Sequence, residues 1–122
     1  MKFPILFFLI TITICLAFVP MIEAWSVNVT FDTTGLECRV WIENAGGYRI
    51  GGDGSNDYRS CIDGNELISN IAEQYWVHAK IEGSLRKPKI RGPYQTDTCF
   101  RLGGTVDNFS FNERDLIHCQ GI

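Results

Sequence analysis

The sequence predicts a small α+β domain: a disulfide-bonded antiparallel sheet with one main helix at residues 63–75 and a short C-terminal helix or turn. Three observations support this prediction. The chain begins with a targeting segment at residues 1–24, an even number of cysteines remains after it, and one amphipathic helical stretch lies among short segments of alternating polarity. Residues 25–122 are expected to form a single secreted domain.

The targeting segment has the three parts of a signal peptide. Lys2 supplies the positive charge, Ile5 to Val19 is an almost unbroken apolar run, and Ala24 is the small residue at the cleavage position. The apolar run is shorter than the roughly 20 residues that a membrane-spanning helix needs. We therefore expect a secreted, extracellular protein whose mature chain has no transmembrane segment.

The cysteines predict two disulfide bonds. Cleavage removes Cys15 and leaves Cys38, Cys61, Cys99 and Cys119, and an even number in a small secreted chain is typical of disulfides. Four cysteines allow three pairings, and the sequence alone does not choose among them. We expect Cys38–Cys61 and Cys99–Cys119, because each of these pairs closes a local loop around a glycine-rich or polar segment.

Strands are predicted where apolar and polar residues alternate. The first two lie at 25–31 and 36–43. On the second strand Trp41 shares the polar face with Arg39, and we expect it to pack beneath Arg39 or a neighbouring loop. The glycine-rich segment 44–57 has no sustained period and is expected to be a loop or loose hairpin. Shorter strands are expected at 77–82, at 98–102 and around Phe109 and Phe111.

The main helix is predicted from a stripe of apolar side chains at helical spacing, with polar residues on the opposite face. Asp63 stands three residues before Glu66, the spacing of a capping box at a helix start. Near the other end of the chain, Asn112 is the expected N-cap of the short C-terminal helix or turn. The stripe consists of Leu67, Ile68, Ile71, Ala72 and Tyr75.

A basic segment from Gly83 to Pro93 is the candidate binding loop. A cluster of this kind binds phosphates, acidic glycans or an acidic protein face, or else is only a solvated loop, and the sequence leaves both interpretations open. Asn28 and Asn108 are formal glycosylation acceptors. No CxxC or HxxxH spacing occurs, so no metal and no cofactor is expected. The four cations of the loop are Arg86, Lys87, Lys89 and Arg91.

An enzymatic interpretation rests on few residues. In a secreted ribonuclease, a histidine and a glutamate act as acid and base, with an arginine near the phosphate. His78, Glu82, Arg101 and His118 are the residues here that could take those roles. The net charge of −3 gives no general electrostatic footprint for nucleic acid, so no nucleic-acid partner is expected.

The order of several short motifs resembles that of a family of fungal secreted effectors, the necrosis-inducing-factor domain of a leaf-mould extracellular protein. The resemblance implies an α+β fold and an apoplastic effector acting on plant tissue, with no known catalytic residues. The matching residues are Cys38, Cys61, Asn70-Ile71, Trp76, Thr98-Cys99-Phe100 and the segment from Phe109 to Leu116.

Two other secreted fungal groups show weaker similarity. Fungal major-allergen-like β-barrel effectors resemble this chain around its cysteines, at Leu36-Glu37-Cys38, Tyr58-Arg59-Ser60-Cys61 and Cys119-Gln120-Gly121. That group is all-β, and the helix expected at 63–75 argues against it. Small killer toxins with an α/β sandwich are the third group, although they normally contain more cysteines.

The sequence therefore predicts a secreted effector or toxin-like protein that acts on host or competitor tissue by binding, without catalysis. Its expected target is a host protein, a glycan or a membrane surface. The alternative is a secreted ribonuclease-like protein, either active or catalytically dead. These two hypotheses differ in one spatial requirement, since the ribonuclease needs His78 and His118 to share a cleft.

Overall fold

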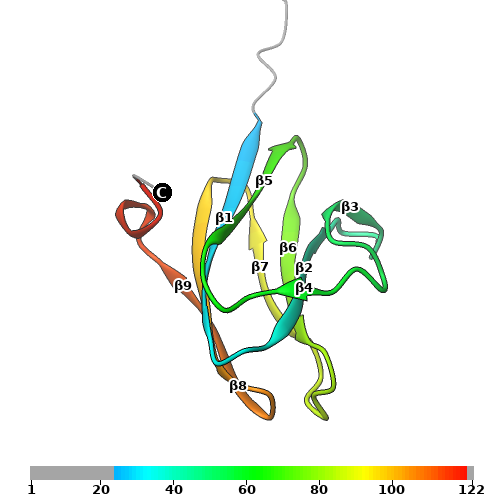
Figure 1. The fold of residues 1–122 in the computed structure, drawn as a ribbon. Coiled ribbons are helices and arrows are strands. Elements are labelled where there is room, and N and C mark those ends of the chain that lie inside the picture. The colour runs from blue at the N-terminus through cyan, green and yellow to red at the C-terminus, as the bar shows by residue number, and fades with distance from the viewer. Residues whose placement is uncertain (1–23, 121–122) are drawn as a thin grey trace, which may run out of the picture.

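Two β-sheets pack face to face in the structure, a computed structural model that describes residues 24–120. The expected signal peptide therefore lies outside the described residues, except for Ala24. The first sheet has the strand order β5-β1-β8-β9, and the second has the order β3-β2-β6-β7 with β4 beside β2 (Figure 1). The strands are β1 Trp25–Thr33, β2 Glu37–Glu43, β3 Arg49–Gly52, β4 Arg59–Ser60, β5 Asn65–Ile71, β6 Tyr75–Ile81, β7 Lys89–Tyr94, β8 Thr98–Thr105 and β9 Asn108–Arg114.

The core lies between the inward faces of the two sheets. Strand β1 is central in the first sheet, antiparallel to β5 and parallel to β8, and its alternate residues Val27 and Val29 are fully buried. Tyr75 from the second sheet is also fully buried, and its hydroxyl donates to the carbonyl oxygen of Thr96 at 2.6 Å. Phe100 and Phe111 stack at 4.7 Å between ring centroids. The alternating patterns of 25–31 and 36–43 thus correspond to half-buried strands.

The predicted helix at 63–75 is wrong. Residues 65–71 form strand β5, which pairs with β1, and residues 72–74 connect it to β6, which begins at Tyr75. Within the described residues the only helical segment is a 3-10 turn, η1, at Leu116–His118, so the fold class is all-β and not α+β.

Local chemistry explains why this segment forms a strand. Gly64 adopts a left-handed conformation with φ of 83°, in the place where the predicted capping box would begin the first helical turn. Ile68 and Ile71 are β-branched, and Ser69 and Asn70 are weak helix formers. Asn70 has φ of 61°, and the pairing of β1 with β5 shifts register near it. Because of this shift, Ile68 and Ile71, three residues apart, both face inward. The buried residues of this strand therefore have the three-residue spacing that is typical of one face of a helix.

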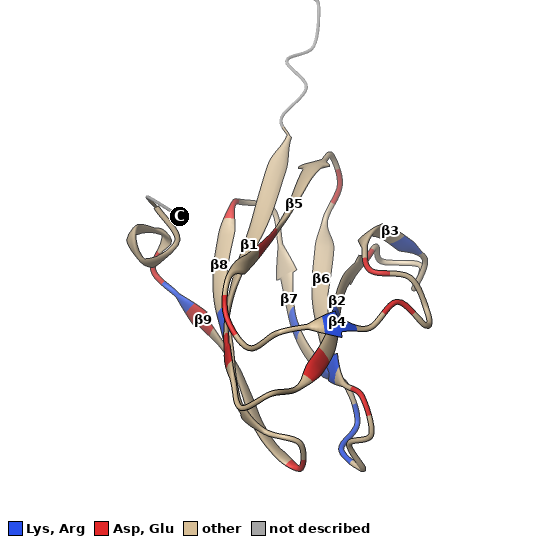
Figure 2. Cartoon of the chain, viewed as in Figure 1, with Lys and Arg blue, Asp and Glu red and all other residues tan. Residues whose placement is uncertain are grey.

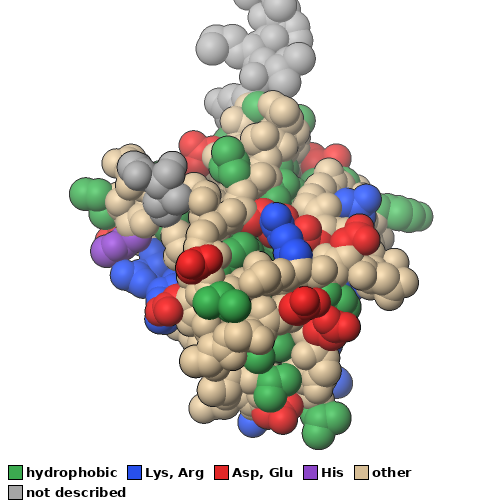
Figure 3. Space-filling view, viewed as in Figure 1, with side chains coloured by type: hydrophobic (Ala, Val, Ile, Leu, Met, Phe, Trp, Pro, Cys, Tyr) green, Lys and Arg blue, Asp and Glu red, His purple; other side chains and the backbone are tan. Residues whose placement is uncertain are grey.

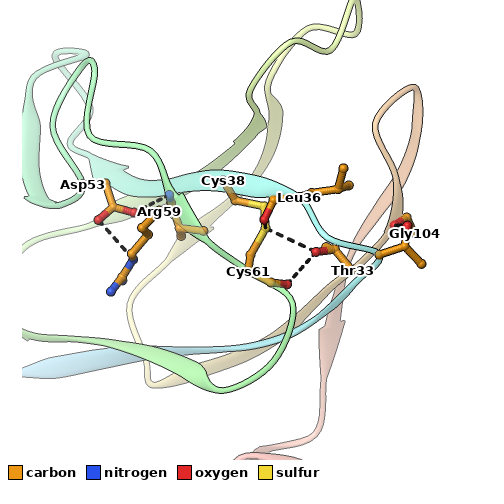
Figure 4. Close-up of a disulfide and its surroundings, with 9 residues drawn as sticks. Thr33, Leu36, Cys38, Asp53, Arg59, Cys61 and Gly104 are labelled. Atoms are coloured by element: carbon orange, nitrogen blue, oxygen red, sulfur yellow. Dashed lines mark hydrogen bonds and ion pairs between the residues drawn. A yellow bond between two sulfur atoms is a disulfide. The ribbon is translucent and has the colours of Figure 1, made fainter.

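The two disulfides join Cys38 to Cys61 and Cys99 to Cys119, the pairs expected from the sequence. Cys61 is a junction between the sheets (Figure 4). Its backbone N–H donates to Leu36 at 3.0 Å, and its carbonyl oxygen accepts from the Thr33 hydroxyl at 2.6 Å. The chain leaves the first sheet between Thr33 and Leu36 and returns to it after Cys61. Cys61 therefore contacts both segments that connect the two sheets.

Within residues 24–120 there is no helix long and apolar enough to cross a membrane.

Leu67 and Ile68 provide a direct test of the strand. A helix would place both on the same apolar stripe, whereas β5 leaves Leu67 61% exposed and Ile68 5% exposed. We predict that Ile68→Ala lowers the free energy of unfolding by about 2–4 kcal/mol, and that Leu67→Ala changes it by less than about 0.5 kcal/mol. Urea unfolding of the two variants measures the difference. Similar losses in both would contradict the strand assignment.

Candidate functional site

A polar groove lies between strands β3 and β5, where an edge of the second sheet faces an edge of the first. Its volume is about 460 Å³, within the range of small-ligand sites. Figure 2 shows the charged residues of β4 and β5 on the side of the molecule that carries this groove, and Figure 3 shows blue and red side chains side by side on that face. The lining residues are Gly51, Gly52, Asp53, Arg59, Asn65, Glu66, Leu67, Ile68 and Ser69.

Three charged side chains define the chemistry of the groove. Arg59 on β4 pairs through its Nη2 with Oε1 of Glu66 on β5, and its Nε lies 3.5 Å from Oδ1 of Asp53. Asp53 is itself fixed to β2, because its Oδ2 accepts from the backbone N–H of Val40 at 2.9 Å. The guanidinium therefore bridges the two sheets, and its side chain remains 45% exposed to a ligand.

Glu66 is the unusual member of this group. Its side chain is only 7% exposed, and its Oε2 atom is buried without a hydrogen-bond partner among the described residues. Buried polar atoms are nearly always paired in folded proteins, so such an atom marks a strained or functional position. Burial raises the pKa of Glu66 to about 7; Asp53 adds to the rise, and the hydrogen bond from Arg59 opposes it.

Two glycines allow the walls of the groove to approach each other. At Gly52, which has φ of 83°, a Cβ atom would lie 2.6 Å from the carbonyl oxygen of Val40 and 2.9 Å from Cδ1 of Ile68. At Gly51 it would lie 3.0 Å from Cγ2 of the same isoleucine. Strand β3 can therefore pack directly against β5 only without side chains at these positions.

Sequence reasoning missed this groove for two reasons. Asp53 and Arg59 lie in or next to the glycine-rich segment that was expected to be a loop, and Glu66 was assigned to the exposed face of a helix. One signal was present: a strand with Ile68 facing inward also turns Glu66 inward, two residues away.

The structure does not assemble the ribonuclease residues. His78 on β6 lies 3.4 Å from Glu43, and the backbone N–H of Glu82 donates to the carbonyl oxygen of Glu37 on β2 at 2.9 Å. Arg101 on β8 pairs with Asp32 on β1, and His118 in η1 lies 3.4 Å from Arg114. Each candidate thus has a different partner, and His78 lies on the second sheet whereas His118 lies in the 3-10 turn after β9. The ribonuclease hypothesis lacks the arrangement that it requires.

The four cations of the basic segment are also separated. Residues 89–94 form strand β7 and are not a loop, so only Arg86 and Lys87 lie in the turn before it. Lys89 and Arg91 are half-buried and lie 5.2 Å and 6.0 Å from the ring centroids of Phe109 and Phe111 on β9. Two of the cations therefore cover the β7–β9 edge of the core, where they also pack against aromatic rings.

Three other sequence predictions can be located. Asn28 lies on the central strand β1, where its side-chain oxygen accepts from Asn65 at 3.0 Å. Asn108 is exposed at the start of β9, and glycosylation of either residue stays a prediction.

The guanidinium carbon of Arg39 lies 4.0 Å from the centroid of the Trp41 ring, which confirms the expected packing.

No protein-family model and no curated protein matches the chain. Among solved structures it is similar to parts of the human-specific toxin intermedilysin (12% identity, TM-score 0.49), listeriolysin O (14%, 0.49) and pneumolysin (11%, 0.49). These alignments cover 76%, 75% and 75% of this chain but only 23%, 22% and 23% of the toxins. The chain spans about a quarter of their length, and similarity at this level identifies neither a family nor a function for it.

The raised pKa of Glu66 predicts an unusual pH dependence of stability. The folded state holds the proton up to about pH 7, whereas the ordinary value is 4.5. Binding of this proton stabilises the folded state fully below pH 4.5, and the stabilisation is lost as the pH rises through 7. We predict that the stability difference between wild type and Glu66→Gln shifts by about 2–3 kcal/mol over this range, with wild type losing stability. Urea unfolding at several pH values measures it, and parallel curves would contradict the assignment.

Proposed function

We propose that this protein is a secreted, disulfide-bonded β-sandwich that acts by binding a glycan in the groove between β3 and β5, without catalysis. The observation that carries the proposal is the groove itself: a preformed polar cavity in which the Arg59 side chain is 45% exposed to a ligand. A glycan hydroxyl in the groove accepts a hydrogen bond from the exposed part of this guanidinium.

The chemistry of the lining distinguishes among the three expected target classes. Carboxylates, a guanidinium and exposed backbone suit a ligand rich in hydroxyl groups, each of which both donates and accepts hydrogen bonds. A membrane surface would require apolar or mainly basic side chains at the contact. Here a single basic side chain, Arg59, pairs with two acidic ones, Asp53 and Glu66, and the groove as a whole is polar.

Secretion and the effector role are part of the same proposal. Two disulfides are typical of proteins from oxidising compartments, and the N-terminal apolar run has the pattern of a signal peptide. The resemblance to necrosis-inducing effectors included a helix after Cys61, and that segment is strand β5. The argument against the all-β major-allergen-like group is thereby removed. We therefore propose a β-sheet effector of fungal origin that acts on host or competitor tissue.

Calorimetric titration of the oxidised mature protein with soluble chitin, β-glucan and pectin oligosaccharides tests the groove. Arg59→Lys keeps the positive charge but loses the planar guanidinium that bridges Asp53 and Glu66. We predict at least a tenfold loss of affinity for the glycan that binds. Arg101→Lys is the matched control: it makes the same change in an ion pair with Asp32 on another face, where the arginine is 38% exposed, and should leave affinity unchanged.

Failure of every oligosaccharide to bind would overturn the glycan assignment, as would equal losses in the two lysine variants. Circular dichroism of both variants establishes that each remains folded.

Infiltration of the oxidised mature protein into plant leaves tests the effector role separately. We expect cell death or a defence response that Arg59→Lys reduces and Arg101→Lys does not. The absence of any response across several plant species would count against an effector acting on plants, while leaving the calorimetric result for the groove intact.

A further inference from the structure

A second pocket lies on the outer face of the second sheet, away from the groove and its residues. Strands β2, β6 and β7 form its floor, and the turn after β2 forms its rim; these strands are neighbours in Figure 1. Its volume is about 300 Å³. The lining residues are Glu43, Asn44, Ala45, Gly47, Trp76, His78 and Ile90.

The register of the strands creates this pocket. Glu43 on β2 pairs directly with Trp76 on β6, and His78 on β6 pairs with Ile90 on β7. Alternate residues of a strand share one face, and Trp76 and His78 are two residues apart. One carboxylate, one indole, one imidazole and one branched aliphatic side chain are therefore brought together on the solvent side of the sheet.

Glu43 gives the pocket its negative charge. Its Oε2 accepts from Nε1 of Trp41 at 2.6 Å and lies 3.4 Å from Nε2 of His78. Burial lowers the pKa of His78, although Glu43 opposes this effect. Among residues 24–120, no lysine or arginine makes an ion pair with this carboxylate.

The walls of the pocket are apolar and braced. Ile90 is 51% exposed although it lies on strand β7. The indole of Trp76 rests on the backbone of β7, because a Cβ atom added at Gly92 would lie 2.9 Å from Cδ1 of the ring. A glycine at this point holds the aromatic side chain close to the sheet.

We propose that this pocket binds a quaternary ammonium group of the choline type. A carboxylate beside an aromatic wall attracts a cation through charge and through the ring quadrupole. The methyl groups of such a cation need no hydrogen bonds and can contact Trp76 and Ile90.

A neutral sugar fits this pocket less well. Trp41 already donates to Glu43, and the side-chain oxygen of Asn44 already accepts from Gly46 at 3.0 Å and from Tyr48 at 3.1 Å. Few polar groups are therefore left for hydroxyls, and a sugar hydroxyl buried without a partner costs free energy.

Titration of the full oxidised protein with choline chloride, followed by tryptophan fluorescence and by backbone amide NMR shifts, tests the proposal. The neutral isostere 3,3-dimethyl-1-butanol and sodium chloride are the controls. We expect saturable shifts at β2, β6 and β7 with choline, and at least tenfold weaker binding of the alcohol. No saturation, or equal binding of the alcohol, would overturn the proposal.

Variants identify the residues. Glu43→Gln removes the charge but keeps an acceptor for Trp41, and Gly92→Ala displaces Trp76; each should weaken choline binding at least tenfold in a protein whose NMR spectrum remains folded. Glu82→Gln, an exposed carboxylate at the end of the same sheet, should change nothing. If Glu43→Gln binds choline as wild type does, the charge assignment fails.

Vesicles distinguish the source of the ammonium group. Sedimentation with phosphatidylcholine vesicles but not with phosphatidylglycerol vesicles assigns the ligand to a lipid head group. Choline binding without sedimentation assigns it to a free ammonium compound, and either result supports the pocket. Arg59→Lys should bind choline normally, so failure of the glycan groove and failure of this pocket are separate results.

Discussion

The junction at Cys61 is the constraint on which the rest of the structure depends. Its sulfur joins β2 through Cys38, its N–H pairs with Leu36, and its carbonyl oxygen holds Thr33 at the end of β1. Two passages of the chain between the sheets are thereby fixed at one point. Arg59 lies two residues before this junction (Figure 4) and Glu66 five residues after it. Their side chains meet at the groove because the backbone between them is held on both sheets.

The two candidate sites arise from different features of the same sandwich. The groove lies where Gly51 and Gly52 let β3 approach β5 and where Arg59 bridges Asp53 and Glu66. The opposite side is closed by Tyr94, whose hydroxyl donates to Glu113 at 2.8 Å, and by cations over aromatic rings. The outer pocket depends on the pairing of β2, β6 and β7 and on the turn after β2. Each site can therefore be removed by substitution while the other remains.

The sequence predicted strands β1, β2, β6, β8 and β9 and the two disulfide pairs, because alternation of apolar and polar residues and closure of loops between nearby cysteines are local signals. It failed at 63–75, where a register shift near Asn70 gives a strand the apolar spacing of a helix. That single error also concealed the groove, since it turned Glu66 toward solvent. The basic segment failed for another reason: composition cannot show that Lys89 and Arg91 pack on the aromatic rings of β9, which follow some 20 residues later.

Hydrogen exchange in two matched disulfide variants tests the role of the junction most directly. The disulfides span 23 and 20 residues, so the chain-entropy model assigns each about 3 kcal/mol. We predict that Cys38→Ala/Cys61→Ala loses amide protection across β4, β5 and the groove, beyond the global loss of stability, whereas Cys99→Ala/Cys119→Ala keeps it there. Equal loss of protection at β4 and β5 in both variants would contradict the account, because the junction would then contribute only chain entropy.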